Sequence, residues 1–265
     1  MAEQDLAPIA LTLDHLFLEF GGLSVLQNLS LTLRGGELLA LIGPNGAGKT
    51  SVLNCICGIY RPSRGSIRFA EQQLVGRLPH HIAQLGIART FQHGEMFQGM
   101  TVLENLLVGR HARIRTGVFG EGLFSRAVRA QEIQHRRRVE EILDFVELSS
   151  FRHRPMASLS FAQQKLAGFA RALALEPKVL LLDEPSAGLN RDAREDLARF
   201  ILRIKHETGI PMIWVEHDMQ MVADLSDRLY VLNHGEYLTD GAPKEVLSDP
   251  KVIAAYLGGA KHEAA

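Results

Sequence analysis

A glycine-rich segment near the start of the chain has the residue types and spacing needed to hold phosphate groups. Residues 43–50 read Gly-Pro-Asn-Gly-Ala-Gly-Lys-Thr. The glycines let successive backbone N–H groups converge on an anion, and a following helix adds its N-terminal dipole. The lysine brings a positive charge to the outer phosphates, and the threonine hydroxyl is a ligand for Mg²⁺. We therefore expect this P-loop to bind a nucleotide through Gly43, Pro44, Asn45, Gly46, Ala47, Gly48, Lys49, Thr50 and Ser51.

An acidic pair supplies the second half of such a site. The apolar run 179–182 ends at Asp183, and Glu184 follows directly. Open α/β sheets bind their ligands at the carboxyl ends of the strands, where this pair would lie. We expect Asp183 to hold Mg²⁺ together with Thr50, and Glu184 to act as the general base that polarises the attacking water.

The elements that position these residues can be read from hydrophobic patterning. Continuous apolar runs at 38–42, 179–182 and 212–215 are typical of strands buried on both faces. Because helical patterns separate them, we expect a largely parallel sheet. Alternation at 29–34 predicts a half-buried strand of an antiparallel sheet near the N-terminus, and residues 233–236 predict the turn of a final hairpin.

The middle of the chain has a different composition. Thr101 and Glu104 form a capping box that predicts a helix through Val108. Glycines and arginines then dominate residues 110–138, which we interpret as an exposed insertion in a helical lobe. The basic run 135–138 could face lipid headgroups or nucleic acid. A solvated helix face balanced by neighbouring glutamates is the favoured interpretation.

Composition sets further bounds. A chain of 265 residues fits one α/β domain with a smaller helical lobe. A net charge of -1 gives no global attraction to nucleic acid or to an anionic membrane. Apolar runs are strand-sized, so we expect no spanning helix. Cys55 and Cys57 are two residues apart and point in different directions on a helix, which predicts unpaired thiols in a reducing compartment.

Residues 158–164, Ser-Leu-Ser-Phe-Ala-Gln-Gln, resemble the signature loop of ABC ATPases, and other motifs of that family follow its order along the chain. Gln92 resembles the Q-loop glutamine, residues 186–190 resemble the D-loop, and His217 resembles the switch histidine. Phe20 stands where the family has an aromatic ring that stacks on adenine. The resemblance covers essentially the whole chain.

This resemblance implies an α/β fold with a P-loop NTPase core and a mainly parallel sheet, an N-terminal antiparallel β subdomain and a helical ABC-specific lobe. The implied single ABC ATPase domain spans 1–265, with the core at about 1–90 and 178–260 and the lobe at about 91–177. ATP and Mg²⁺ are the implied cofactors.

The resemblance also assigns roles to individual residues. Glu184 and His217 would be catalytic, and Gln92 would join Thr50 and Asp183 at the metal. The signature residues would face the nucleotide of a partner subunit; they are Ser160, Phe161, Ala162 and Gln163.

Within the family, residues 88–92, 101–105, 215–219 and 252–258 are similar to one ATPase of the branched-chain amino-acid importers. The implied partners are a second ATPase subunit (the same chain or a different one), two transmembrane permeases and, indirectly, an extracytoplasmic solute-binding protein, with no nucleic acid. The implied location is peripheral, on the cytoplasmic face of the inner membrane. A non-transport ABC ATPase, or an importer of urea, amides or aromatic acids, stays open as an alternative.

The chain departs from the family in two motifs. Phe161 and Ala162 replace the two glycines of the broad family's signature, and Asn190 replaces the usual D-loop aspartate. Side chains in the signature restrict the backbone and add bulk where it approaches the partner's nucleotide. We therefore expect two unequal ATP sites, with faster hydrolysis at the one built on this chain's P-loop. The alternative is that the signature loop keeps its usual backbone path and both sites hydrolyse ATP alike.

Overall fold

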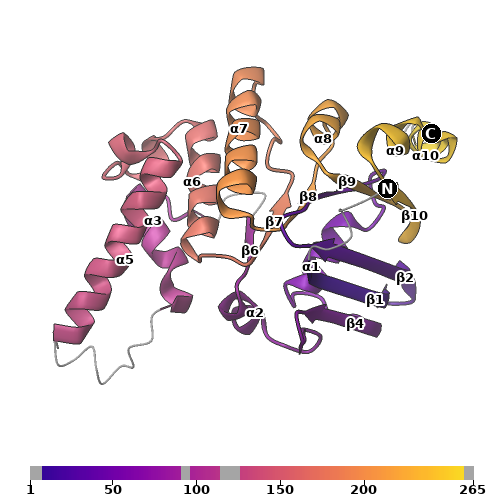
Figure 1. Cartoon of the computed structure of the whole chain (residues 1–265), viewed down its shortest axis with the longest axis horizontal. Coiled ribbons are helices and arrows are strands. Elements are labelled where there is room, and N and C mark those ends of the chain that lie inside the picture. The colour runs from indigo at the N-terminus through magenta and orange to yellow at the C-terminus, as the bar shows by residue number, and fades with distance from the viewer. Residues whose placement is uncertain (1–7, 91–95, 114–125, 260–265) are drawn as a thin grey trace.

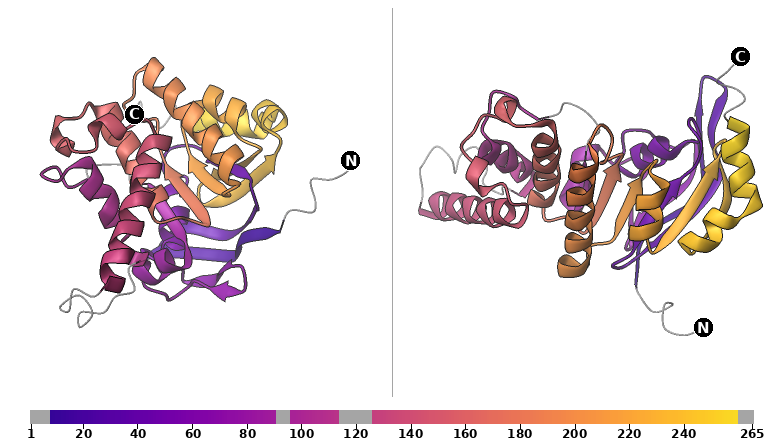
Figure 2. Two further views of the ribbon diagram at one scale, coloured as in Figure 1. Left: turned by 60° about the vertical axis from the view of Figure 1, so that its left-hand side comes forward. Right: turned by 90° about the horizontal axis from the view of Figure 1, so that it is seen from above.

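The computed structural model describes residues 8–90, 96–113 and 126–259. Two sheets share the centre of the molecule with flanking helices, and a helical lobe lies to one side (Figure 1). Seen from above, the lobe and the sheets lie next to each other along the longest axis (Figure 2). None of the described helices is long and apolar enough to cross a lipid bilayer.

The larger sheet has the strand order β10-β9-β3-β8-β7-β6, and only β10 runs antiparallel to its neighbour. Its strands are β3 (Leu38–Ile42), β6 (Ile87–Thr90), β7 (Val179–Asp183), β8 (Met212–Val215), β9 (Arg228–Asn233) and β10 (Glu236–Gly241). Every residue of β3, β7 and β8 is buried, so the predicted central strands and mainly parallel sheet are confirmed. The predicted hairpin joins β9 to β10.

The smaller sheet is antiparallel, with the order β2-β1-β4-β5. Its strands are β1 (Ile9–Phe20), β2 (Leu23–Arg34), β4 (Arg64–Phe69) and β5 (Gln72–Gln73). In β2, Leu29, Leu31 and Leu33 are buried while Ser30 is exposed, which confirms the predicted alternation. These leucines share one core with Val52 and other apolar side chains of the first helix.

The helices that flank the sheets in the described part of the chain are α1 (Lys49–Ile56), α2 (Pro79–Leu85), α7 (Arg191–Thr208), α8 (Met219–Leu225), α9 (Pro243–Ser248) and α10 (Pro250–Gly259). Cys55 lies in α1 and Cys57 just after it. Both are free thiols, as expected from their spacing.

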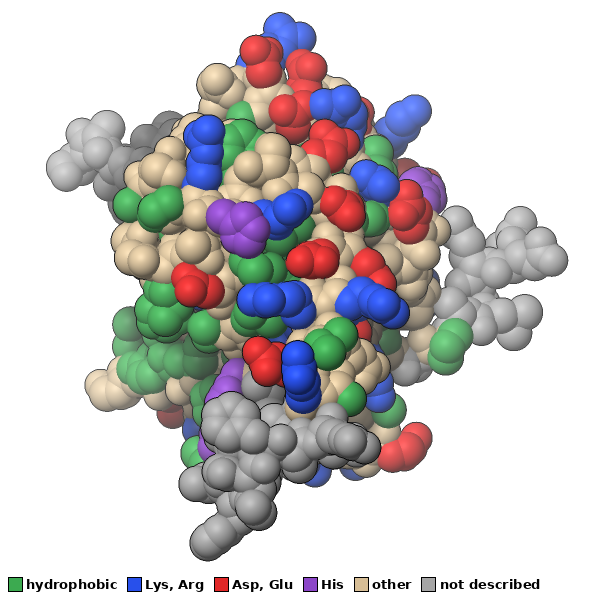
Figure 3. Space-filling model, turned by 90° about the vertical axis from the view of Figure 1, so that its left-hand side faces the viewer, with side chains coloured by type: hydrophobic (Ala, Val, Ile, Leu, Met, Phe, Trp, Pro, Cys, Tyr) green, Lys and Arg blue, Asp and Glu red, His purple; other side chains and the backbone are tan. Residues whose placement is uncertain are grey.

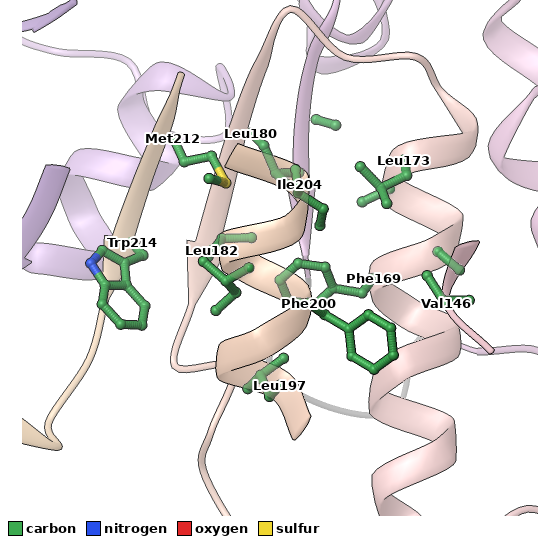
Figure 4. Close-up of a cluster of buried hydrophobic side chains, with 14 of the residues drawn as sticks. Val146, Phe169, Leu173, Leu180, Leu182, Leu197, Phe200, Ile204, Met212 and Trp214 are labelled. Atoms are coloured by element: carbon green, nitrogen blue, oxygen red, sulfur yellow. The ribbon is translucent and has the colours of Figure 1, made fainter. Parts of the chain in front are cut away.

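The helical lobe contains α3 (Val102–Gly109), α5 (Arg126–Phe145) and α6 (Phe161–Ala174), with short 3-10 turns at His111–Arg113, Ser149–Phe151 and Met156–Ser158. The predicted capping box starts α3: the Thr101 hydroxyl accepts the N–H of Glu104, and the Glu104 carboxylate accepts the N–H of Thr101. The lobe packs onto the core through apolar side chains (Figure 4). Phe169 and Leu173 of α6 lie beside Phe200 and Ile204 of α7, which in turn covers β7.

Residues 126–138 of the predicted insertion belong to α5, and residues 114–125 of the insertion lie outside the described part of the chain. Arg136, Arg137 and Arg138 are all exposed, and Arg138 pairs with Glu141 at 2.6 Å and with Glu176 at 3.1 Å. Figure 3 shows acidic and basic side chains interspersed over this side of the molecule. These pairs support the interpretation of a solvated helix face, which stays a prediction.

Candidate functional site

The glycine-rich P-loop joins β3 to α1, and two of its glycines are required by the space around them. Gly43 has φ 150, and a Cβ there would lie 2.1 Å from the carbonyl oxygen of Leu232. Gly48 has φ 100, and a Cβ there would lie 2.8 Å from the Leu26 side chain. No other residue type fits these two positions, because the chain approaches β9 and β2 too closely.

The turn between β9 and β10 is hydrogen-bonded to this loop. The Gly235 N–H donates to the Ala47 carbonyl at 3.1 Å, and the Gln27 N–H donates to the Gly235 carbonyl at 2.9 Å. One turn residue therefore ties the P-loop to β2. The sequence predicted this turn but not its contact with the loop.

Lys49 folds back onto its own loop. Its Nζ donates to the carbonyl oxygens of Gly43 at 2.8 Å and Pro44 at 2.9 Å. Burial lowers the pKa of the Lys49 ammonium, and the carboxylates of Glu184 and Asp183 oppose that shift. The positive charge thus lies within the electrostatic reach of both predicted acidic residues.

Asp183 ends β7 in a fully buried position. Its Oδ2 accepts from Arg89 of the neighbouring strand β6 at 2.5 Å, and Arg89 also donates to the Asn54 side chain at 2.5 Å. Its Oδ1 is buried with no hydrogen-bond partner among the described residues. Sequence reasoning missed both Arg89 and the short strand that carries it.

Glu184 and His217 lie together, as the resemblance implied. Nε2 of His217 is 2.9 Å from Oε1 of Glu184, which is hydrogen-bond distance. The tautomer of the imidazole decides which of the two atoms is the donor. The buried Glu216, which was not predicted, accepts the N–H of Ser186 at 2.8 Å and the N–H of His217 at 3.0 Å. It therefore joins the two segments on either side of the pair. An apolar strand end followed by Glu-His was the available signal for it.

A divalent metal would find few protein ligands here. Among the residues that the structure describes, no group of three His, Cys, Asp or Glu side chains could hold one. The unpartnered Oδ1 of Asp183 and the hydroxyl of Thr50 at the start of α1 are hard oxygen donors. This sparse set fits Mg²⁺, which keeps most of its coordination for water and phosphate oxygens.

The signature residues stand at the start of α6, away from the P-loop in sequence. Ser160 caps the helix: its hydroxyl accepts the N–H of Gln163, whose side-chain oxygen accepts the N–H of Ser160. Phe161 and Ala162 are the first helical residues, and neither has a positive φ. The expected restriction of the backbone is therefore absent, because this conformation suits any residue. Phe161 is half exposed.

The remaining predicted residues have simpler surroundings. The Phe20 ring is half exposed at the end of β1 and meets the edge of Tyr60, with ring centroids 5.0 Å apart. Asn190 caps α7 through its side-chain oxygen, which accepts the N–H of Ala193 at 3.0 Å. Gln92 lies outside the described residues.

The sequences of known proteins support the resemblance to ABC ATPases. Residues 26–187 match the profile described as ABC transporter, and residues 238–262 match one described as branched-chain amino acid ATP-binding cassette transporter. The chain is 40% identical to the high-affinity branched-chain amino acid transport ATP-binding protein LivG of Salmonella typhimurium, over 94% of this chain and 98% of LivG. It is 39% identical to BraF of Pseudomonas aeruginosa, with the same coverage.

Solved structures with a similar fold also belong to ABC transporters. A nucleotide-free ATP-binding cassette from an ABC transporter superposes with a TM-score of 0.81 at 31% identity, covering 92% of this chain and 97% of that one. The ADP conformation of MJ1267, an ATP-binding cassette of an ABC transporter, gives 0.82 at 30% identity, covering 94% and 99%. The chain therefore belongs to the ABC transporter family, as one of its ATP-hydrolysing subunits.

Proposed function

We propose that this subunit powers the uptake of branched-chain amino acids or closely related small solutes. The observation that carries the proposal is similarity to LivG and BraF over nearly the whole chain, together with the C-terminal profile at residues 238–262. That profile lies outside the part of the chain that matches the general ABC transporter profile.

The proposed chemistry follows from the residues at the carboxyl ends of β3 and β7. The P-loop amides and Lys49 bind the phosphates of ATP. Lys49 exchanges the Gly43 and Pro44 carbonyls for phosphate oxygens. Glu184 accepts a proton from the attacking water, and His217 holds the Glu184 carboxylate in place through the 2.9 Å contact. Thr50 and Asp183, with Gln92, would hold Mg²⁺, which neutralises charge on the phosphates.

Two surfaces of the chain would serve partners. The capped start of α6, with Ser160, Phe161, Ala162 and Gln163, faces the nucleotide of a second ATPase subunit. A groove of about 360 Å³ between the lobe and the core offers exposed apolar side chains such as Ile59 and Val108, and Arg89 lines it. We assign this groove to a transmembrane permease, and we propose that the subunit is a peripheral protein at the cytoplasmic face of the inner membrane.

Reconstitution tests the proposal. The subunit is assembled in proteoliposomes with the permeases and partner ATPase from neighbouring genes, and uptake is measured with the cognate solute-binding protein. We expect ATP-dependent uptake of leucine, isoleucine or valine, which Glu184→Gln strongly lowers. Uptake of urea, amides or aromatic acids instead would reassign the cargo. ATPase activity indifferent to permeases and solute would contradict a transport function.

A further inference from the structure

Lys165 lies on α6 and reaches the backbone that carries the proposed catalytic base. Its Nζ donates to the carbonyl oxygen of Glu184 at 3.3 Å and to that of Pro185 at 3.2 Å. The Glu184 carbonyl also accepts the N–H of Ala187 at 3.2 Å. The signature helix therefore contacts the end of β7 at the main chain, directly beside the hydrolytic centre.

The backbone of Glu184 needs such support. Its φ of 46 lies in the left-handed region, where the Cβ of a non-glycine residue comes too close to the following carbonyl oxygen. Such a conformation persists only where surrounding contacts impose it. The Glu184 N–H donates to the Val215 carbonyl at 2.9 Å, and Lys165 binds on the carbonyl side. Together these bonds fix both peptide groups around the Glu184 Cα and so the direction of its side chain towards His217.

Phe161 adds a second contact from the same helix. It precedes Lys165 by one turn, and the Lys165 ammonium lies 5.5 Å from the centroid of its ring, within cation–π range. The ring also borders Gly188, where an added Cβ would lie 3.0 Å from Phe161 Cε1. The first turn of α6 thus contacts both ends of the segment 184–188.

The Lys165 ammonium interacts electrostatically with two carboxylates. Burial lowers the pKa of the Lys165 ammonium, whereas Glu216 and Glu184 act to raise it. Glu216 is itself buried and bonds to the N–H groups of Ser186 and His217. Lys165 is therefore electrostatically coupled to the groups that orient the hydrolytic pair.

The helix that carries Lys165 is well placed to transmit a displacement. Its start is the capped signature loop, and its other end is packed into the core through Phe169 and Leu173 (Figure 4). Close-packed interiors transmit strain instead of absorbing it. A shift of α6 at Ser160 therefore changes the contacts of Lys165 with Glu184.

We propose that Lys165 is a positioning residue that ties the orientation of Glu184 to the position of α6. Engagement of this chain's signature loop by the nucleotide of a second subunit then readies this chain's own hydrolytic site. The inference rests on the proposed roles of Glu184 and the signature loop. Lys165 acts through the backbone of Glu184 and does not touch the nucleotide.

The test uses the assembled transporter with the partner ATPase's catalytic glutamate changed to glutamine, so that only this chain's site turns over. Lys165→Met keeps the aliphatic stem and removes the ammonium. We expect kcat to fall about 10- to 100-fold, the scale of a misplaced catalytic group, with KM for ATP changed less than about threefold. Lys165→Arg, which keeps the charge, should recover most of kcat. Lys244→Met makes the same change at an exposed position of α9 and should leave kcat unaltered.

The reciprocal background carries Glu184→Gln, so that only the partner's site turns over. There Ser160→Ala should lower kcat more than Lys165→Met does.

An unchanged kcat for Lys165→Met at this chain's own site would overturn the inference, and so would a loss confined to the partner's site. Thermal unfolding curves separate lost turnover from lost folding, and Lys165→Gln replaces the Met variant if that variant unfolds. Activity of this chain's site despite Glu184→Gln would instead refute the proposed role of Glu184 as the general base.

Discussion

Arg89 and Asp183 form an ion pair across the neighbouring strands β6 and β7, with Nη2 and Oδ2 2.5 Å apart. The Asp183 side chain is buried, and the Arg89 side chain is 9% exposed. The pair occupies one oxygen of the carboxylate and leaves Oδ1 without a partner among the described residues. Arg89 thus holds the Asp183 carboxylate from one side. Arg89 also lines the groove that we assign to a permease.

Removing this arginine should destabilise the subunit strongly. Arg89→Met leaves the Asp183 charge buried and uncompensated, and we expect the free energy of unfolding to fall by about 3–5 kcal/mol. Urea denaturation of the purified subunit measures this change. Arg136→Met, at an exposed position of α5, should alter it by less than about 0.5 kcal/mol. Equal effects of the two changes would show that the buried pair has no special role.

Lys49→Ala should weaken nucleotide binding and hydrolysis together. A charge-assisted hydrogen bond contributes about 1.5–3 kcal/mol, which corresponds to about 10- to 100-fold in Kd. Calorimetric titration with Mg-ATP measures the affinity, and Lys244→Ala is the matched control. Unchanged affinity in the Lys49 variant would remove the basis for assigning the phosphate site to this loop.

Glu184→Gln should preserve ATP binding and slow hydrolysis at least about 100-fold, because the amide cannot accept the proton of the attacking water. The ATP-bound dimer should accumulate and elute early in size-exclusion chromatography. Glu195→Gln makes the same change on the exposed face of α7 and should leave turnover intact. Near wild-type turnover of the Glu184 variant would place the base at another residue.

The two thiols should be unreactive in the folded subunit. Burial raises the pKa of Cys55 to about 12, and it raises the pKa of Cys57 to about 11 against an opposing effect of Arg89. The folded state therefore keeps protons that the unfolded thiols lose. Their contribution to stability is complete below the unfolded pKa of about 8.5 and declines as the pH rises towards 11.

Alkylation by iodoacetamide checks this at pH 8, where we expect labelling only after denaturant is added. Rapid labelling of the native subunit would contradict the assigned burial.

The two ATP sites of a heterodimer should still differ. Phe161 is half exposed at the start of α6, so its ring adds bulk where the partner's nucleotide would approach, although the backbone is helical there. Disabling the catalytic glutamate of each subunit in turn measures the difference. We expect Glu184→Gln to remove more ATPase activity than the matching change in the partner. The opposite ranking would refute the asymmetry.

The main strands and the motifs of the site could be predicted because each depends on local pattern. The apolar runs of β3, β7 and β8 are buried on both faces, and the capping residues of α3 act within one helical turn. The strands β4, β5 and β6 were missed. They are short or charged. β4 and β6 are strands because they pair with distant segments, and the two-residue β5 is a strand because it pairs with β4.

The same reason explains the functional residues that were missed. Lys165 reads in the sequence as an ordinary polar position of an amphipathic helix, and Glu216 as the residue before a motif histidine. Their importance comes from hydrogen bonds to backbone groups far away in the chain, at Glu184 and Ser186 respectively. Spacing alone does not reveal such contacts, since they depend on how α6, β7 and β8 are arranged in space.

The hydrogen bonds of Gly235 affect when the P-loop can fold during synthesis of the chain. Ala47 and Gln27 are made early by the ribosome, but their shared partner in the β9–β10 turn is made late. The neighbours of β3 in the sheet, β8 and β9, also come from the C-terminal third of the chain. Folding of the phosphate loop therefore has to wait until most of the polypeptide has emerged. A nascent chain that stops before residue 235 lacks the hydrogen bonds that join the P-loop to β2 through Gly235.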